Sequence, residues 1–459
     1  MSVDWNPISW KAKLSGQEIR YGDAAAVDHA VAKLGSLPPL VTSWEVERLK
    51  AQIAEAQRGE RFLLQGGDCA ETLADCQSSV ITATLKVLLQ MALVLTHGGQ
   101  KPVIRVGRFA GQYAKPRSSA VETRRGEGGE VVELPSYFGD LVNSPEFDSA
   151  AREPDPERLV LGYQHAALTL NFIRSLTSGG FADLHHPEYW ELDFVEDDEL
   201  APELKNEYRR LCDEIASALR FAEAVSDRSF DEVSRAEFFT SHEGLNLLYE
   251  SAQTREVPRR EGWYDLTTHL PWIGERTREI DGAHVEFFRG IRNPVGVKLG
   301  PSATPDEVIE LARVLNPEDE PGKLMFIARM GADRLASRLP LLIEAVKTSG
   351  RQVLWVCDPM HGNSQITSSG IKTRDFENIL REVELSFDIH ENLGSVLGGV
   401  HFELTGEHVT ECIGGASGVS ESDLITNYRS GCDPRLNYAQ SLEMAFRISR
   451  RMKARKASL

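Results

Sequence analysis

The feature that most constrains the fold of this chain is a regular alternation of short apolar runs and amphipathic segments between residues 290 and 405. The apolar runs are Val295–Leu299, Leu324–Ala328, Val353–Cys357 and Gly399–Glu403. Runs of this length predict parallel strands that are buried on both faces. The first three begin at residues 295, 324 and 353, a spacing of 29 residues, close to the roughly 30 residues of a strand–helix–strand unit.

The same kind of apolar run occurs four more times earlier in the chain. These runs are Phe62–Gln65, Val103–Val106, Glu237–Thr240 and Tyr264–His269. Eight strands joined by helical crossovers predict an α/β fold, the closed (β/α)8 TIM barrel, which takes about 250 residues. Because the chain has 459 residues, about 200 residues remain for embellishments of the barrel.

We expect one embellishment at the N-terminus. Residues 1–60 precede the first strand and predict an extension with a helix from Ser43 to about Arg58. Thr42 and Glu45 have the spacing of a capping box at the start of that helix.

The barrel domain is then residues 61–459, with a second embellishment between strands two and three. Residues 155–225 predict extra helices in that interval. The first helix is expected to open at Asp155–Pro156 and close at Gly179–Gly180, and the second to run from about Pro202 to Ala224.

Composition excludes several classes of partner. The chain has 69 acidic and 51 Lys or Arg residues and a net charge of −18, so we expect no nucleic acid partner. Six cysteines without a CxxC pair predict neither a disulfide framework nor a structural zinc cluster. The most apolar helical stretch, Val87–Leu95, is too short to span a bilayer, and the N-terminus lacks a secretory pattern. We therefore expect a cytoplasmic protein without a membrane partner.

Cations gather directly after the second predicted strand, where Arg108, Lys115 and Arg117 are followed by Ser118. Arginine offers a planar fork of donors and lysine a compact charge, while Pro116 stiffens the turn between them. A solvated basic turn is the alternative interpretation. In a strongly acidic chain, however, such a cluster indicates a small anion such as phosphate held in a cleft.

Active sites of TIM barrels lie at the carboxyl ends of the strands, and cations follow several of the predicted strands. The set is Arg108, Lys115, Arg117, Arg276, Lys298 and Arg329. Together they could neutralise two phosphates and a carboxylate. A surface ion pair would explain a single arginine, but Lys298 lies inside an apolar strand, where a lysine needs a partner.

Other strand ends supply possible metal ligands. Cys69, His361, Glu403 and Asp433 offer one sulfur, one nitrogen and two carboxylates, a set that suits a divalent transition metal with an open position. Their spacing matches no recognised metal motif. Periodicity alone therefore leaves open a core cysteine and a scattered histidine.

Seven ordered blocks of the sequence resemble the type II 3-deoxy-D-arabino-heptulosonate 7-phosphate (DAHP) synthases over nearly the whole chain. The blocks are Gly66–Glu71, Arg108–Ser118, Trp272–Thr277, Asn293–Gly300, Cys357–Asn363, Glu403–Glu407 and Cys432–Asn437. The resemblance implies a transferase that condenses phosphoenolpyruvate with erythrose 4-phosphate to give DAHP and phosphate, the first step of the shikimate pathway.

The resemblance also implies roles for the candidate residues. Phosphoenolpyruvate would be held by Arg108, Lys115, Glu275, Arg276, Lys298 and Arg329, and the aldehyde's phosphate by Arg117 and Ser118. The metal ligands would be Cys69, His361, Glu403 and Asp433, for manganese or cobalt, with iron or zinc as alternatives. Lys115, Glu275 and His361 are the catalytic candidates, although the general acid and base stay open.

The extension and the inserted helices look like segments that form subunit contacts and aromatic amino acid sites in long type II enzymes. We therefore expect a homodimer or homotetramer with possible aromatic amino acid effectors, and chorismate mutase is a possible partner. The loop Ser119–Leu134 departs from the family pattern, because it is longer and richer in Gly and Glu than the resemblance leads us to expect. Two rival hypotheses are a synthase for another keto-sugar acid and a non-catalytic homologue.

Cys432 stands beside the candidate ligand Asp433. We hypothesise that, in the metal-free protein, its thiol comes close to Cys69. A disulfide between the two cysteines would then switch the enzyme off.

Overall fold

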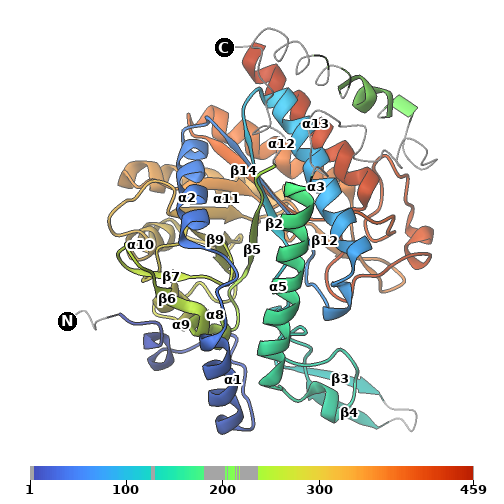
Figure 1. Cartoon of the computed structure of the whole chain (residues 1–459). Coiled ribbons are helices and arrows are strands. Elements are labelled where there is room, and N and C mark those ends of the chain that lie inside the picture. The colour runs from blue at the N-terminus through green and yellow to red at the C-terminus, as the bar shows by residue number, and fades with distance from the viewer. Residues whose placement is uncertain are drawn as a thin grey trace.

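The structure is a computed structural model, and it describes residues 5–125, 130–179, 202–203, 205–211, 213, 217 and 236–457. Eight parallel strands follow one another in chain order around a closed barrel with helices outside it (Figure 1). The strands are β1 (Phe62–Gly67), β2 (Val103–Arg108), β5 (Phe239–Glu243), β8 (Leu270–Ile273), β9 (Val295–Leu299), β10 (Leu324–Ala328), β11 (Leu354–Cys357) and β14 (Leu397–Glu403). The predicted (β/α)8 barrel is confirmed.

The barrel closes where the first strand pairs with both the second and the last. Gly67 at the end of β1 lies beside Glu403 of β14 on one side and Arg108 of β2 on the other. Every residue of β1, β9, β10 and β14 is buried, which explains the near-continuous apolar runs. The register therefore brings segments from both ends of the chain to one edge of the barrel.

The prediction of the fourth strand was wrong in its position. The barrel strand is β8, whereas the predicted stretch begins with β7 (Trp263–Asp265), which pairs antiparallel with β6 (Thr254–Glu256). The residues between them are used in side-chain contacts: the hydroxyl of Thr267 donates to Asp265 at 2.7 Å, and His269 Nδ1 accepts from the Thr240 N–H at 2.9 Å. These buried polar contacts displace the start of the barrel strand to Leu270.

Side chains cap the start of three of the helices outside the barrel, α8 (Leu247–Gln253), α10 (Pro305–Leu315) and α12 (Phe376–Asn392). Further helices outside the barrel are α9 (Ala283–Phe288), α11 (Ala332–Ser349) and α13 (Tyr438–Ala457). At the start of α10, the Thr304 hydroxyl accepts from the Glu307 N–H at 3.3 Å and Pro305 takes the first helical position, a favourable start for a helix.

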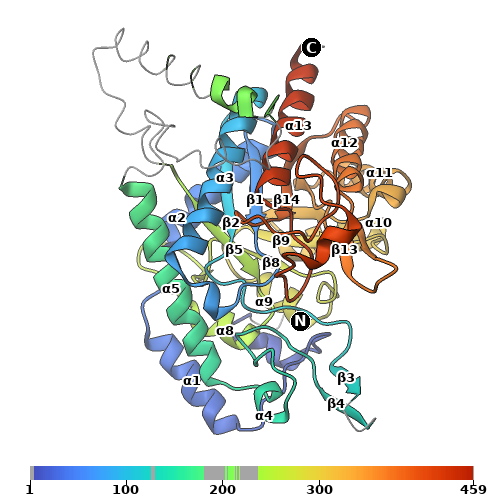
Figure 2. The same ribbon diagram turned by 90° about the vertical axis from the view of Figure 1, so that its right-hand side faces the viewer.

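Helix α3 (Ser78–Gly99) is longer than its most apolar stretch suggested. It is apolar and long enough to cross a membrane by length and composition, so the expectation based on Val87–Leu95 was wrong about its extent. Yet 67% of its most apolar window is buried inside the protein. It lies along α13 in both ribbon views (Figures 1 and 2). Helix α3 is therefore a core helix.

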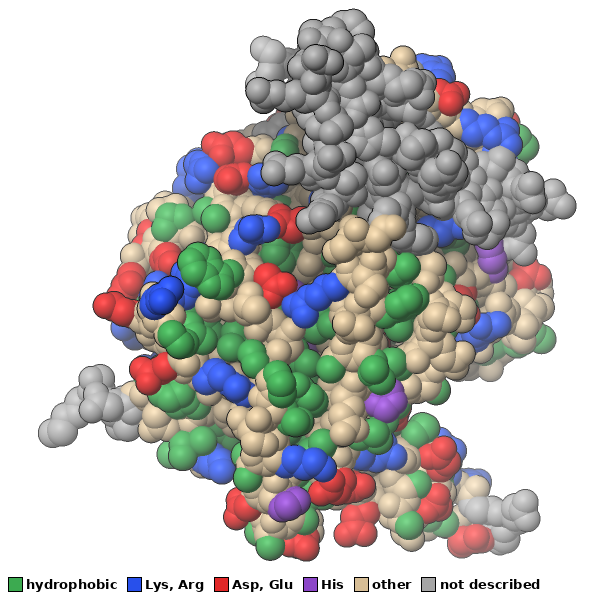
Figure 3. Space-filling view, in the orientation of Figure 1, with side chains coloured by type: hydrophobic (Ala, Val, Ile, Leu, Met, Phe, Trp, Pro, Cys, Tyr) green, Lys and Arg blue, Asp and Glu red, His purple; other side chains and the backbone are tan. Residues whose placement is uncertain are grey.

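The N-terminal extension contains η1 (Ser9–Ala12), α1 (Ala24–Ser36) and α2 (Ser43–Gln57). The capping box of Thr42 and Glu45 is confirmed at the start of α2. The space-filling view in Figure 3 shows acidic and basic side chains interspersed over this face of the molecule.

Helices also interrupt the chain between β2 and β5. The short α4 (Ser149–Arg152) precedes α5 (Glu157–Ser178), which ends at Gly179 as predicted. Most of the second predicted inserted helix lies outside the described residues. Helix α5 packs against α1 (Figure 2).

The segment after the cation cluster is a projecting β-hairpin rather than a plain loop. Strands β3 (Val121–Arg125) and β4 (Val131–Pro135) pair antiparallel and extend away from the barrel (Figure 1). The buried guanidinium of Arg152 anchors the base of this hairpin, because it donates to Glu122 at 2.9 Å and to the Pro135 carbonyl at 3.1 Å.

Candidate active site

A pocket of about 520 Å³, including its mouth, opens at the carboxyl ends of the barrel strands. Each of the eight strands contributes a lining residue at or just beyond its end. The lining residues are Cys69, Arg108, Gln112, Lys115, Pro116, Glu243, Trp272, Gly274, Glu275, Arg276, Lys298, Arg329, His361, Glu403 and Asp433.

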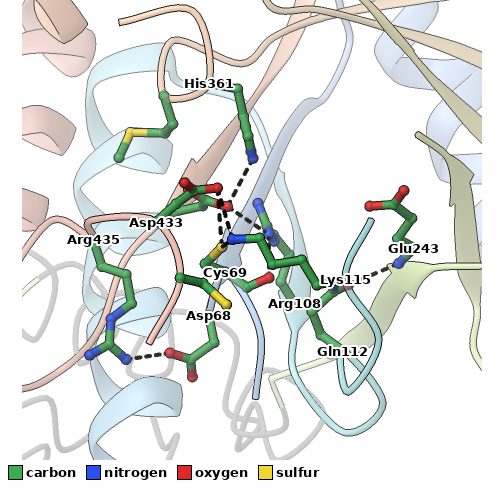
Figure 4. Close-up of polar contacts among 12 residues, drawn as sticks. Asp68, Cys69, Arg108, Gln112, Lys115, Glu243, His361, Asp433 and Arg435 are labelled. Carbon is green, nitrogen blue, oxygen red and sulfur yellow. Dashed lines mark hydrogen bonds and ion pairs between the residues drawn. The ribbon is translucent and has the colours of Figure 1, made fainter. Parts of the chain in front are cut away.

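The four predicted metal ligands all line this pocket, and Figure 4 shows three of them, Cys69, His361 and Asp433, gathered together. Ligand atoms of Cys69, Glu403 and Asp433 lie within 4.8 Å of one another. His361 adds its Nε2 at 2.9 Å from Glu403 Oε1, and its Nδ1 lies 2.7 Å from Asp358 Oδ2. A thiol, an imidazole and two carboxylates in this arrangement fit a divalent transition metal, and a carboxylate behind the histidine is a usual orienting partner.

Both carboxylates of the cluster are held in the ionised form. Burial tends to raise the pKa of Glu403, but His361, Arg374 and Arg108 hold it well below its usual value. Arg108 Nη2 lies 3.1 Å from one oxygen of Glu403, and Arg374 Nη1 lies 2.8 Å from the other. Burial opposes the ionisation of Asp433 as well, but Lys115 contributes to holding its pKa well below the usual range. Ionised carboxylates are the form that binds a cation.

The ammonium of Lys115 points into the cluster (Figure 4). Its Nζ lies 3.2 Å from Cys69 Sγ and 3.1 Å from Asp433 Oδ2. Burial would lower the pKa of Lys115, but the charges of Cys69, Cys432 and Asp433 raise it well above its usual value. Lys115 therefore stays cationic beside the ligand set.

The guanidinium of Arg108 is fixed from several sides. Its Nη1 contacts His401 Nε2 at 2.7 Å, and its plane lies over Trp272, 5.2 Å from the ring centroid. Burial, followed by the charges of Lys298 and Arg108, lowers the pKa of His401 well below its usual value. A neutral His401 can accept the hydrogen bond of the arginine. This preorganises a fully buried donor for an anion in the pocket.

Lys298 has the partner that a buried lysine needs. Its Nζ contacts Asp358 Oδ2 and lies 5.7 Å from the Trp272 ring centroid. Burial lowers the pKa of Lys298 to about 8; Asp358 opposes this shift, whereas Arg108 adds to it. A bound anion would therefore stabilise the charged form of Lys298.

Arg329, Arg276 and Glu275 are the remaining predicted residues that line the pocket. Arg329 is half-buried and donates from Nη2 to the His361 carbonyl at 3.2 Å, while Arg276 is exposed. Glu275 Oε2 accepts from the Gly300 N–H at 2.6 Å. The structure thus brings the predicted phosphoenolpyruvate residues into one pocket.

Arg117 and Ser118 are the two predicted residues that do not line the pocket. Arg117 is partly buried, and its backbone N–H donates to Gln17 Oε1 of the extension at 2.7 Å, whereas Ser118 is exposed. Both follow Pro116, which does line the pocket. They therefore lie along the chain just beyond the pocket wall.

The structure adds residues that the sequence analysis did not assign. Gln112, Glu243 and Trp272 line the pocket. Glu243 and Trp272 lie at strand ends, a signal that could have found them. Arg374 and Lys372 gave no such signal, because they come from a small hairpin of β12 (Ser364–Ile366) and β13 (Lys372–Arg374). Arg374 is fully buried against Glu403, and Lys372 contacts Asp433.

A closed barrel whose eight strand ends all contribute to one pocket of cations, a thiol, an imidazole and carboxylates defines the class of (β/α)8-barrel enzymes. Residues 5–449 match the Class-II DAHP synthetase family. The chain belongs to that family, which confirms the resemblance and makes it an enzyme of the transferase type.

Relatives from a fungus and from bacteria agree with the family match. A Neurospora crassa protein named phospho-2-dehydro-3-deoxyheptonate aldolase is 48% identical over 97% of this chain and 94% of its own length. A Streptomyces coelicolor protein of the same name is 47% identical, over 96% of each chain. The Mycolicibacterium smegmatis protein named phospho-2-dehydro-3-deoxyheptonate aldolase AroG is 46% identical over 93% of this chain and 90% of its own.

Proposed function

We propose that this enzyme condenses phosphoenolpyruvate with erythrose 4-phosphate to give DAHP and phosphate, the first step of the shikimate pathway. The observation that carries the proposal is one pocket that holds five of the predicted cations next to a Cys, His and carboxylate cluster. That arrangement suits a phosphorylated acid brought against a second substrate. Membership of the Class-II DAHP synthetase family supports the same reaction.

The cations divide the substrate charges between them. Arg108, Lys298 and Arg329 line the pocket, where they would bind the phosphate and carboxylate of phosphoenolpyruvate. Arg276 lies exposed near the rim and would close over the same phosphate. Arg117 and Ser118, just beyond the pocket wall, are assigned to the phosphate of the aldehyde substrate.

Cys69, His361, Glu403 and Asp433 would hold a divalent metal ion. Manganese and cobalt fit a mixed sulfur, nitrogen and oxygen set, as do iron and zinc. When bound, such an ion supplies a Lewis acid that polarises the carbonyl of the aldehyde.

The chain's own residues position the reactants and stabilise charge. Carbon 3 of the enol attacks the aldehyde carbon, water adds at carbon 2, and the resulting phosphohemiketal loses phosphate by cleavage of its carbon–oxygen bond. The fixed Arg108 and the ammonium of Lys298 stabilise the departing phosphate. The ammonium of Lys115 would stabilise the negative charge that develops on the aldehyde oxygen, and it is this chain's own candidate for the proton donor there. Glu275, which accepts from the Gly300 N–H, would orient the attacking water.

The test is a steady-state assay of metal-stripped protein with both substrates, with manganese or cobalt added back and the loss of enol absorbance followed. We expect turnover that depends on metal, disappears in Cys69→Ala and falls in Glu275→Gln. Turnover with a different aldose phosphate in place of erythrose 4-phosphate would reassign the acceptor. Absence of turnover with every metal and acceptor would leave the non-catalytic hypothesis.

We also infer a cytoplasmic homodimer or homotetramer that uses the N-terminal extension and the region of α5 for subunit contacts. Aromatic amino acids and chorismate mutase are the effectors and partner proposed with it. Light scattering of the purified enzyme, and assays with Trp, Phe, Tyr or a chorismate mutase added, test these proposals directly.

A further inference from the structure

A fully buried carboxylate on α12 lies outside every sequence block and outside the pocket. Glu382 has an exposed fraction of 0% and sits in the middle of a crossover helix, on the face that packs against the barrel. Charged residues are almost never buried so completely without partners. Its partners therefore indicate what it does.

Among the described residues, three hydrogen bonds reach this carboxylate, all from loops at the carboxyl ends of two neighbouring strands. Oε1 accepts from the backbone N–H groups of Met330 at 3.0 Å and Gly331 at 2.9 Å. Oε2 accepts from Nδ2 of Asn363 at 2.6 Å. Asn363 continues the link, because its Oδ1 accepts from the Ala332 N–H at 3.1 Å.

Each of these loops carries a residue of the active site. Arg329 immediately precedes Met330 after β10, and His361 lies two residues before Asn363 after β11. The loops also touch each other, since Arg329 Nη2 donates to the His361 carbonyl at 3.2 Å. The backbones approach so closely that a Cβ on Gly362 would lie 2.1 Å from the nitrogen of Gly331, which itself has a φ of +82°. Such an approach requires glycine on both loops.

We propose that Glu382 is a positioning residue that fixes the loop of Arg329 against the loop of His361, and so sets the distance between the phosphate-binding side and the metal-binding side of the pocket. The link to substrate binding rests on the proposed function. The link between the two loops rests on the contacts alone.

The contacts require a carboxylate at this position. Three donors converge on two oxygens, and no acceptor faces the group in these contacts. Burial and the charge of Asp358 raise the pKa of Glu382 to about 8, while the Gly331 and Met330 N–H groups and Asn363 oppose the shift. The comparison of carboxylate with amide is therefore made above pH 8, where the carboxylate is the main form. A glutamine would keep the shape but place an NH₂ group against a donor, which leaves one partner without an acceptor.

The chain supplies a matched control and a compensating change. Glu384 lies two residues further along the same helix and is exposed, so Glu384→Gln makes the same chemical change without touching the loops. In the double variant Glu382→Gln/Asn363→Asp the polarity of the pair is reversed: the amide of residue 382 can donate to the carboxylate of residue 363. The double variant loses the bond from Asn363 Nδ2 to the Pro359 carbonyl at 2.8 Å.

The experiment combines amide hydrogen exchange without substrates and kinetics with phosphoenolpyruvate. In Glu382→Gln we expect faster exchange of residues 330–332 and a fall of about tenfold in kcat/KM for phosphoenolpyruvate, the loss of one hydrogen bond to a charged group. Glu384→Gln should match the wild type in both. The double variant should recover protection and most of kcat/KM.

The proposal is overturned if Glu382→Gln exchanges like Glu384→Gln, or if the double variant folds and stays as unprotected as the single one. Should Glu382→Gln fail to fold, Asn363→Asp alone provides the same test, because it sets two carboxylates against each other and should free the same amides. Hydrogen exchange needs no turnover. An enzyme inactive with erythrose 4-phosphate would therefore refute the proposed function without deciding the role of Glu382.

Discussion

Lys298 should make phosphoenolpyruvate binding pH-dependent above neutrality. Burial lowers the pKa of this lysine from 10.5 to about 8, a shift worth about 3 kcal/mol against the charged form. A bound phosphate or carboxylate favours the ammonium. Binding must therefore be accompanied by proton uptake wherever the free enzyme holds a neutral lysine, and affinity falls as the pH rises through about 8.

The magnitude follows from that pKa. At pH 9 about one tenth of the free enzyme carries the ammonium, so the dissociation constant for phosphoenolpyruvate should rise about tenfold relative to its value below pH 7, or about 1.4 kcal/mol. Calorimetric titration at constant ionic strength between pH 7 and 9 measures this rise directly. Other groups also titrate in this range, so the comparison must be with a variant.

Lys298→Met supplies that comparison. It should bind more weakly than the wild type at pH 7, and its disadvantage should shrink about tenfold by pH 9, since the wild type loses its charge over that interval. Lys298→Arg, whose guanidinium stays protonated, should keep a constant advantage over the methionine variant. A wild-type advantage that is the same at pH 7 and pH 9 would refute the assigned pKa and its cause.

The remaining predictions concern the carboxylate and thiol groups of the cluster. Arg374→Met should lower the free energy of unfolding by about 3–5 kcal/mol, because it leaves the buried Glu403 one cation short; a change below 1 kcal/mol in urea unfolding would contradict this. Burial is the largest cause that raises the pKa of the Cys69 thiol. The pKa of Cys432 is lowered to about 6, and the largest cause is the hydrogen bond between Cys432 and Cys69. Both thiols are free, and we expect oxidised glutathione to join them in metal-free protein, so that metal added back no longer restores turnover. Cys432→Ser should resist, and mass spectrometry that finds both thiols free would count against the disulfide.

Local sequence patterns were sufficient for the barrel where strands are buried on both faces. β9 and β10 are near-continuous apolar runs in the sequence, interrupted in β9 by Lys298, and lie within the barrel wall in the structure. The fourth strand was misplaced because the aromatic start of Tyr264–His269 fits a strand of the barrel as well as a strand of the small antiparallel sheet of β6 and β7. Only the buried contacts of Thr267 and His269 show that these residues precede the barrel strand.

Candidate residues at strand ends could be predicted because barrel topology dictates where those ends meet. Arg374 escaped prediction since a hairpin within a loop carries it to Glu403, and no periodicity encodes that path. The family resemblance assigned Arg117 to substrate binding together with its neighbours, but its backbone N–H is hydrogen-bonded to Gln17 of the N-terminal extension. Glu382 has the sequence surroundings of an ordinary surface helix. Its role depends on three donors that only tertiary structure brings together.

The closure of the barrel has a consequence for synthesis on the ribosome. Cys69 and Asp433 are 364 residues apart in the chain although their side chains lie 3.5 Å apart. At 5–20 residues per second, the nascent chain displays the cysteine for roughly 20–70 s before its acidic partner exists. Helix α13, which covers α3, emerges later still. A chain released before its last thirty or so residues would therefore lack both the helix that covers α3 and Asp433, one of the residues that line the pocket.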